Sequence, residues 1–170
     1  MKYSKTQTTY HWLTVALLVV MALSGFAYSY DWIGNGIIRL HQVAGQLLIL
    51  VLCARLATRL YGHRPVDDIA RAFWERQAAR VVHASLYVCL IAYVVTGYVA
   101  ASGLRDPLLI APLNQALARS DGGELFLEAH FTLKWVLLVL VSVHIAATLK
   151  HRFWDKDDTF SQMTFTSKKG

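Results

Sequence analysis

Four apolar stretches, each close to the length of a membrane-spanning helix, dominate the sequence. They cover about residues 11–30, 37–58, 81–101 and 129–150. A helix needs about 20 mainly apolar residues to cross the hydrocarbon of a bilayer. Since 55% of the residues are hydrophobic and only 16% are charged, we expect an all-α membrane protein. The predicted architecture is a four-helix up-down transmembrane bundle, formed by residues 1–170 as a single domain.

The first apolar stretch resembles a signal peptide only in part. Lys2 and Lys5 precede it, as basic residues precede a signal peptide. It ends, however, in an aromatic cluster and not at a small-residue cleavage site; the cluster is Phe26, Tyr28, Tyr30 and Trp32. Aromatic rings gather at membrane–water interfaces, so we expect this helix to be retained.

The basic residues lie between the apolar stretches and predict an orientation. The N-terminal residues, residues 55–80 and residues 150–170 hold thirteen of the seventeen Lys and Arg residues. Connections rich in Lys and Arg stay on the cytoplasmic side, which predicts that both termini are cytoplasmic. The net charge of +6 follows this membrane pattern and forms no basic stripe of the kind that binds nucleic acid.

Two of the connections between the apolar stretches each contain a segment that predicts a short surface helix. Residues 67–80, "DDIARAFWERQAAR", predict an interfacial helix on the cytoplasmic side. Residues 111–119, "APLNQALAR", follow a proline-containing segment and predict a short helix lying flat on the opposite surface.

Histidines recur at matching depths in the predicted helices. His130 and His144 are fourteen residues apart, which on a helix is about 21 Å of rise with about 40° of rotation, so both rings share one face. His41 begins the second helix at the depth of His130, and His11 begins the first at the depth of His144. The sequence therefore predicts two layers, each with two imidazoles on facing helices.

The chemistry of these layers favours haem over zinc. No Asp, Glu or Cys lies at these depths to complete a zinc site, and we interpret Cys53 and Cys89 as free buried thiols. Two opposed neutral imidazoles fit the axial positions of a six-coordinate haem iron. We therefore predict two b-type haems, with iron ligands His11, His144, His41 and His130.

Three other histidines are alternatives or neighbours. His83 begins the third helix at the depth of His144 and remains an alternative to His11. His151 lies past Lys150 at the interface, and His63 is expected to be solvated.

Glycines lie on the histidine-bearing faces. Gly25 follows His11 by fourteen residues, Gly97 follows His83 by fourteen, and Gly45 lies one turn past His41. The missing side chains either let a porphyrin approach the backbone or allow close helix packing.

Several segments resemble the bacterial cytochrome b561 family across nearly the whole chain. They are "KYSKTQTTYHW", "LHQVAG", "CARLATRL", "VHASLYVCLIAYVVTGY" and "HIAATLKHRFWDKDDTF". The resemblance implies a multi-pass protein of the bacterial inner membrane that holds two b-type haems. It places His11 and His144 on the cytoplasmic haem and His41 and His130 on the periplasmic one.

Within the family, the chain is most similar to members that oxidise superoxide. That similarity implies electron transfer from periplasmic superoxide to ubiquinone, with Arg39, Lys134 and Arg105 as candidates for steering the anion. Phe131, which follows a ligand histidine where close relatives often have an acidic residue, departs from the pattern, as does Arg152 after His151.

Two other functions fit the same helices. The first alternative is a cytochrome b anchor subunit that carries electrons between a partner dehydrogenase or hydrogenase and the quinone pool. The second alternative is a small transporter or proton-conducting bundle that uses the histidines as relays. At the cytoplasmic end of the second helix, Arg55 and Arg59 are expected to pair with haem propionates or with lipid phosphates.

Overall fold

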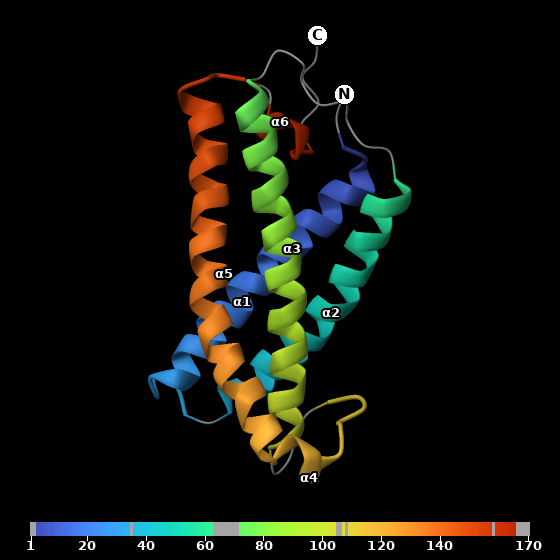
Figure 1. Ribbon diagram of the computed structural model, residues 1–170, viewed down its shortest axis with the longest axis vertical. Coiled ribbons are helices and arrows are strands. Elements are labelled where there is room, and N and C mark those ends of the chain that lie inside the picture. The colour runs from blue at the N-terminus through green and yellow to red at the C-terminus, as the bar shows by residue number, and fades with distance from the viewer. Residues whose placement is uncertain are drawn as a thin grey trace.

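Four long helices form an up-down bundle in the computed structural model of the chain (Figure 1). The structure describes residues 3–34, 36–62, 72–104, 107, 109–157 and 159–165. The long helices are α1 (Lys5–Ser29), α2 (Ile37–Tyr61), α3 (Phe73–Ser102) and α5 (Asp121–Phe153), and the one-turn helices are α4 (Gln115–Ala118) and α6 (Thr159–Gln162). The predicted all-α bundle is thereby confirmed.

The bundle has two ends, which are named here by their place in Figure 1. At the upper end, α1 and α3 begin and α2 and α5 end. At the lower end, α1 and α3 end, and α4 lies beside the start of α5.

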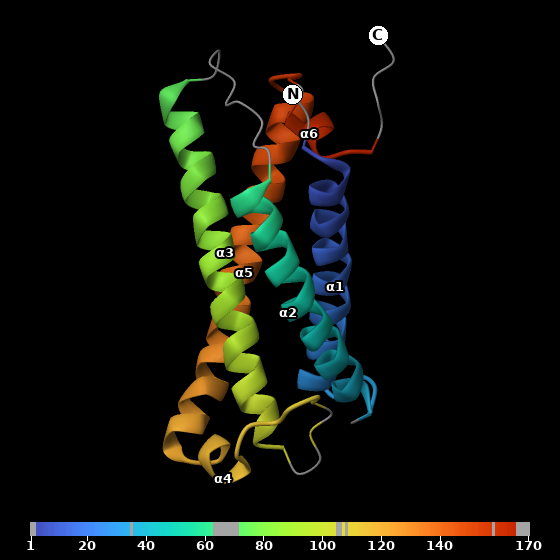
Figure 2. The same ribbon diagram turned by 90° about the vertical axis from the view of Figure 1, so that its right-hand side faces the viewer.

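The long helices associate as two pairs. Helix α1 packs mainly on α2, and α3 packs mainly on α5, while α2 and α3 join the pairs (Figure 2). Buried apolar residues from all four helices form one core, in which Leu48 is completely inaccessible and Leu90 and Leu137 are buried. Leu48 follows His41 by seven residues and Leu137 follows His130 by seven, so the core lies between the two histidine depths.

Three of the long helices begin well before the predicted apolar stretches, because their first turns are polar. In α1, Ser4 forms a capping box with Gln7, a motif that fixes a helix start. The first turn of α5 contains Asp121 and Glu124, which interact favourably with the positive end of the helix dipole. At about 1.5 Å per residue, the 33 residues of α5 exceed the hydrocarbon thickness, so its ends extend beyond the apolar layer.

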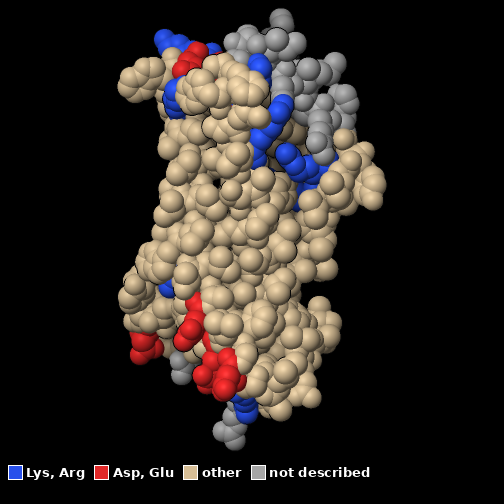
Figure 3. Space-filling model, viewed as in Figure 1, with Lys and Arg blue, Asp and Glu red and all other residues tan. Residues whose placement is uncertain are grey.

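The surface of the bundle is that of a membrane protein. All four long helices are long and apolar enough to cross a bilayer, and mid-helix side chains such as Leu23, Leu50, Val88 and Val139 are more than half exposed. A space-filling view shows a wide belt without charges, with Lys and Arg gathered mostly above it and Asp and Glu mostly below it (Figure 3). Exposed apolar side chains on every helix are expected where lipid is the solvent.

The connections agree in part with the predicted surface helices. Residues 73–80 form the first two turns of α3 instead of a separate interfacial helix, because no helix-breaking residue separates "FWERQAAR" from the apolar stretch that follows. The predicted helix in residues 111–119 is present as α4, whose first amide groups are capped by Asn114. His63 and Arg105 lie outside the described residues.

Candidate functional site

His41 projects from α2 onto α1. Its Nδ1 lies 3.0 Å from the carbonyl oxygen of Met21 and 3.2 Å from Oγ of Ser24. The Ser24 hydroxyl donates to the carbonyl oxygen of Val20 at 2.7 Å, so its oxygen is available to accept a hydrogen bond from the imidazole.

His130 projects from α5 onto α3 in the same way. Its Nδ1 lies 3.0 Å from the carbonyl oxygen of Tyr93 and 3.3 Å from Oγ1 of Thr96. The Thr96 hydroxyl donates to the carbonyl oxygen of Ala92 at 2.8 Å. The imidazole is also stacked on the Tyr93 ring, with centroids 4.1 Å apart and an interplanar angle of 7°.

These contacts fix the tautomer of both histidines. A backbone carbonyl only accepts hydrogen bonds, so Nδ1 of His41 and of His130 must carry the proton. In the neutral ring, Nε2 then has a free lone pair, and such a bond at the other ring nitrogen is what orients metal-binding histidines. The two rings face each other with centroids 6.3 Å apart and an interplanar angle of 87°. We call His41 and His130 the lower layer.

Glycines provide the space in which these two rings lie. A Cβ at Gly25 would lie 3.1 Å from Cε1 of His41, and one at Gly97 would lie 2.7 Å from Cε1 of His130. A Cβ at Gly45 would make only an ordinary contact, 3.6 Å from Cε of Met21. At Gly25 and Gly97, therefore, the missing side chain makes room for an imidazole of the paired helix.

The upper layer contains three histidines and an arginine: His11, His83, His144 and Arg55. The His83 and His144 rings have centroids 5.2 Å apart, at 61°, and His11 lies near both. Nη2 of Arg55 donates to Nδ1 of His11 at 2.8 Å. Because a guanidinium only donates, the neutral His11 ring carries its proton on Nε2 in this arrangement, the reverse of the tautomer in the lower layer.

Arginine side chains of α2 turn into the upper end of the bundle. The guanidinium carbons of Arg55 and Arg59 lie 5.4 and 5.5 Å from the centroid of the Tyr87 ring. Arg55 is half-buried and holds His11, so it does not extend to the surface as a lipid-facing arginine would.

Two of the three predicted anion-steering residues, Arg39 and Lys134, lie among the described residues. Arg39 is exposed near the start of α2, and Lys134 lies one turn past His130, with which it interacts electrostatically. The Lys134 ammonium is 5.1 to 5.3 Å from the ring centroids of Phe26, Phe131 and Trp135. It forms no hydrogen bond or ion pair with another described residue.

Phe26, Phe131 and Trp135 thus form an aromatic cage around Lys134. An open cavity of about 470 Å³ lies beside this cage. It is lined by Tyr28, Ser29, Asp31 and Phe131, so Phe131 borders both the cavity and the cage around Lys134. The cavity gives solvent access to the lower end of the bundle, although Asp31 contributes a negative charge to its wall.

Sequence reasoning missed the hydroxyl groups that orient the lower layer. Ser24 and Thr96 each stand immediately before one of the glycines and thirteen residues after a histidine, His11 and His83 respectively. This repeated spacing was the available signal. Its two copies lie on α1 and α3, the helices on which His41 and His130 are seated.

Comparisons with known proteins agree on one family. The family model described as prokaryotic cytochrome b561 matches residues 2–166. "Cytochrome b561 homolog 2" of Escherichia coli (strain K12) is 31% identical over 95% of this chain and 90% of its own length. "Cytochrome b561 homolog 1" of the same organism is 25% identical over 95% of this chain and 96% of its own length.

Proposed function

Because the chain belongs to the prokaryotic cytochrome b561 family of haem b electron-transfer proteins, we propose that it binds two b-type haems and passes electrons from superoxide to ubiquinone. Electron transfer in the membrane through haem b follows from family membership.

The lower layer is the observation that carries the proposal. A nitrogen ligand lies about 2 Å from a bound metal ion and about 1 Å from its own ring centre, so two imidazoles on opposite sides of one ion have centroids about 6 Å apart. The His41 and His130 centroids are 6.3 Å apart, and both Nε2 lone pairs are free. The donor set and spacing therefore fit a haem iron.

In the upper layer, we propose His11 and His144 as the second pair of ligands. The His83 and His144 centroids are 5.2 Å apart, which is less than the spacing of two imidazoles on opposite sides of one ion. For His11 to bind iron through Nε2, Arg55 must release Nδ1. A haem propionate would be a suitable new partner for Arg55, because a guanidinium binds a carboxylate in a bidentate manner.

When bound, the haems supply one-electron redox chemistry between the two ends of the bundle. The chain's own residues provide the rest. Hydrogen bonds from the imidazoles to Met21 and Tyr93 hold two ligands in one tautomer, and the apolar core between the layers excludes water. Lys134 places a positive charge beside His130, where an anionic donor would be attracted.

The proposed reaction transfers two electrons from two superoxide ions to one ubiquinone. Two superoxide ions each lose one electron and leave as two molecules of oxygen, while ubiquinone gains two electrons and two protons. We propose that superoxide arrives at the lower end through the cavity beside Phe131, and that Lys134 is the main steering residue. Arg39 and Arg105 remain candidates for the same role.

The charge distribution supports one orientation in the bacterial inner membrane. Lys and Arg gather at the upper end (Figure 3), and basic segments remain in the cytoplasm. We therefore propose that the upper end, with both termini, is cytoplasmic and that the lower layer lies toward the periplasm.

Purified chain reconstituted with ubiquinone tests the proposal. A pyridine haemochrome assay should give two haems per chain. Addition of superoxide should produce ubiquinol, measured by ultraviolet absorbance. The rate of ubiquinol formation should exceed the rate at which superoxide is lost by spontaneous dismutation. Haem without ubiquinol formation would refute the superoxide reaction and favour the anchor-subunit function. Absence of haem in chain expressed with ample haem supply would refute the whole proposal.

A further inference from the structure

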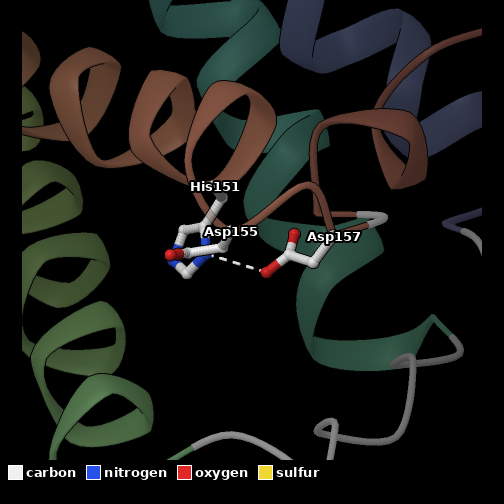
Figure 4. A group of neighbouring side chains, drawn as sticks. All are labelled: His151, Asp155 and Asp157. Carbon is white, nitrogen blue, oxygen red and sulfur yellow. Dashed lines mark hydrogen bonds and ion pairs between the residues drawn. The ribbon is translucent and has the colours of Figure 1, made fainter.

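One imidazole and two carboxylates converge where α5 ends (Figure 4). Nδ1 of His151 lies 2.9 Å from Oδ2 of Asp155 and 2.8 Å from Oδ2 of Asp157. One potential ligand atom from each of the three side chains lies within 4.8 Å of the others. We call these residues the His151 cluster.

The chain reverses direction to form the His151 cluster. The amides of Trp154 and Asp155 both donate to the carbonyl oxygen of Lys150, and the amide of Asp157 donates to that of His151. Between the two aspartates, Lys156 has a φ of 53°, a left-handed conformation that is unfavourable for a residue with a Cβ. This turn directs both carboxylates back to the same ring.

Two carboxylates share one imidazole nitrogen in the His151 cluster. Lys150 adjoins the cluster, with its ammonium 2.8 Å from Asp155 and 2.9 Å from a third carboxylate, Glu75. A neutral His151 has at most one N–H at Nδ1, so it cannot fully satisfy two carboxylates at once. A dication placed among these side chains would contact the imidazole and both carboxylates together.

The donor set also selects the kind of cation. One imidazole nitrogen with carboxylate oxygens suits zinc and its first-row neighbours, whereas magnesium and calcium prefer oxygen ligands alone. The side chains are 16% exposed at His151, 31% at Asp155 and 25% at Asp157. The cluster is thus accessible from water while the groups are partly desolvated.

We propose that His151, Asp155 and Asp157 form a binding site for a divalent first-row transition metal, with zinc as the representative ion and water completing its coordination. The site is separate from both histidine layers and does not depend on the proposed haems. A bound ion would fix the turn against the end of α5, next to the Lys150–Glu75 ion pair that connects α5 to α3.

Zinc binding to the purified full-length, haem-loaded protein tests the proposal. After chelator treatment, which leaves haem iron in place, isothermal titration calorimetry with zinc chloride should show one equivalent bound per chain at micromolar concentration. His151→Ala and Asp157→Asn should each weaken binding about tenfold or more, since each removes a ligand. Asp121→Asn is the matched control, because it removes an exposed carboxylate at the other end of the bundle.

The possible results are distinct. No saturable zinc binding by the wild-type protein would show that the cluster is an ion pair only, and would overturn the proposal. Unchanged binding in both cluster variants would place the zinc elsewhere, and this too would overturn the proposal. Haem absorbance of each variant verifies that it is folded. X-ray absorption at the zinc edge should show nitrogen and oxygen ligands, and a sulfur ligand would point to a cysteine and refute the assignment.

Discussion

Replacing Gly97 by alanine tests how closely the bundle holds His130. The new Cβ would lie 2.7 Å from Cε1 of the ring, which is 0.7 Å short of the 3.4 Å of an ordinary contact. The ring has little freedom to move away, because it is stacked on Tyr93 and bonded at 3.0 Å to the Tyr93 carbonyl oxygen. A shift of this size along the bond would lengthen it to about 3.7 Å, beyond hydrogen-bonding range.

The expected effect is a loss of the lower haem, proposed to lie on His41 and His130. Leaving a buried polar group without its partner costs about 1–3 kcal/mol. Since about 1.4 kcal/mol corresponds to a factor of ten, Gly97→Ala should weaken retention of this haem about five- to a hundredfold. Gly25→Ala needs a shift of only 0.3 Å, and Gly45→Ala makes an ordinary contact. The predicted order of damage is therefore Gly97, then Gly25, then Gly45.

The assay is the haem content of each variant after gel filtration, combined with a spectroscopic redox titration that separates the two haems. Gly45→Ala is the matched control, because it adds the same methyl group to a helical glycine near the same layer. A full haem complement and an unchanged lower-haem potential in Gly97→Ala would refute the reasoning. So would equal damage in Gly45→Ala, because the effect would then come from helix packing in general.

Three further predictions concern the histidines proposed as haem ligands and Arg55. His130→Ala should remove only the lower haem and His144→Ala only the upper one, as measured by the pyridine haemochrome ratio and difference spectra; loss of the opposite haem would contradict the two-layer assignment. His11→Ala should lose the upper haem while His83→Ala keeps it, and the reverse result would make His83 the ligand. Arg55→Met should lower the midpoint potential of the upper haem, because a nearby cation stabilises the reduced state, and Arg55→Lys should restore much of the shift; potentiometry that shows no change would exclude this role.

The sequence predicted the depth of the histidines because helical rise depends only on residue number. His41 and His130 are 89 positions apart in the chain, yet counting turns from each helix start placed them at one level, and the structure brings their rings together. Their assignment as iron ligands remains a prediction. The starts of α1, α3 and α5 were predicted too late, since an apolar window does not include polar first turns such as that of Ser4 and Gln7.

Side-chain contacts between neighbouring helices could not be predicted from the sequence. Hydropathy gives the depth of a residue but not which neighbouring helix its face contacts, so the seating of His41 on Ser24 and of His130 on Thr96 was not predicted. The contact between Arg55 and His11 was missed for the same reason, because an arginine near a helix end is expected to extend to the interface. The turn that joins His151 to Asp157 depends on a left-handed residue, Lys156, and its sequence has no glycine to indicate one.

The pairing of the helices bears on how such a protein is assembled. The hydrogen bonds of the His41 ring come from α1 and those of the His130 ring come from α3, so each helical hairpin orients its own imidazole. Two hairpins of this kind can enter the membrane one after the other during synthesis, each with its imidazole already in the correct tautomer. A cofactor bound between His41 and His130 would then connect the α1–α2 hairpin to the α3–α5 hairpin. Its insertion would therefore be the last step of assembly.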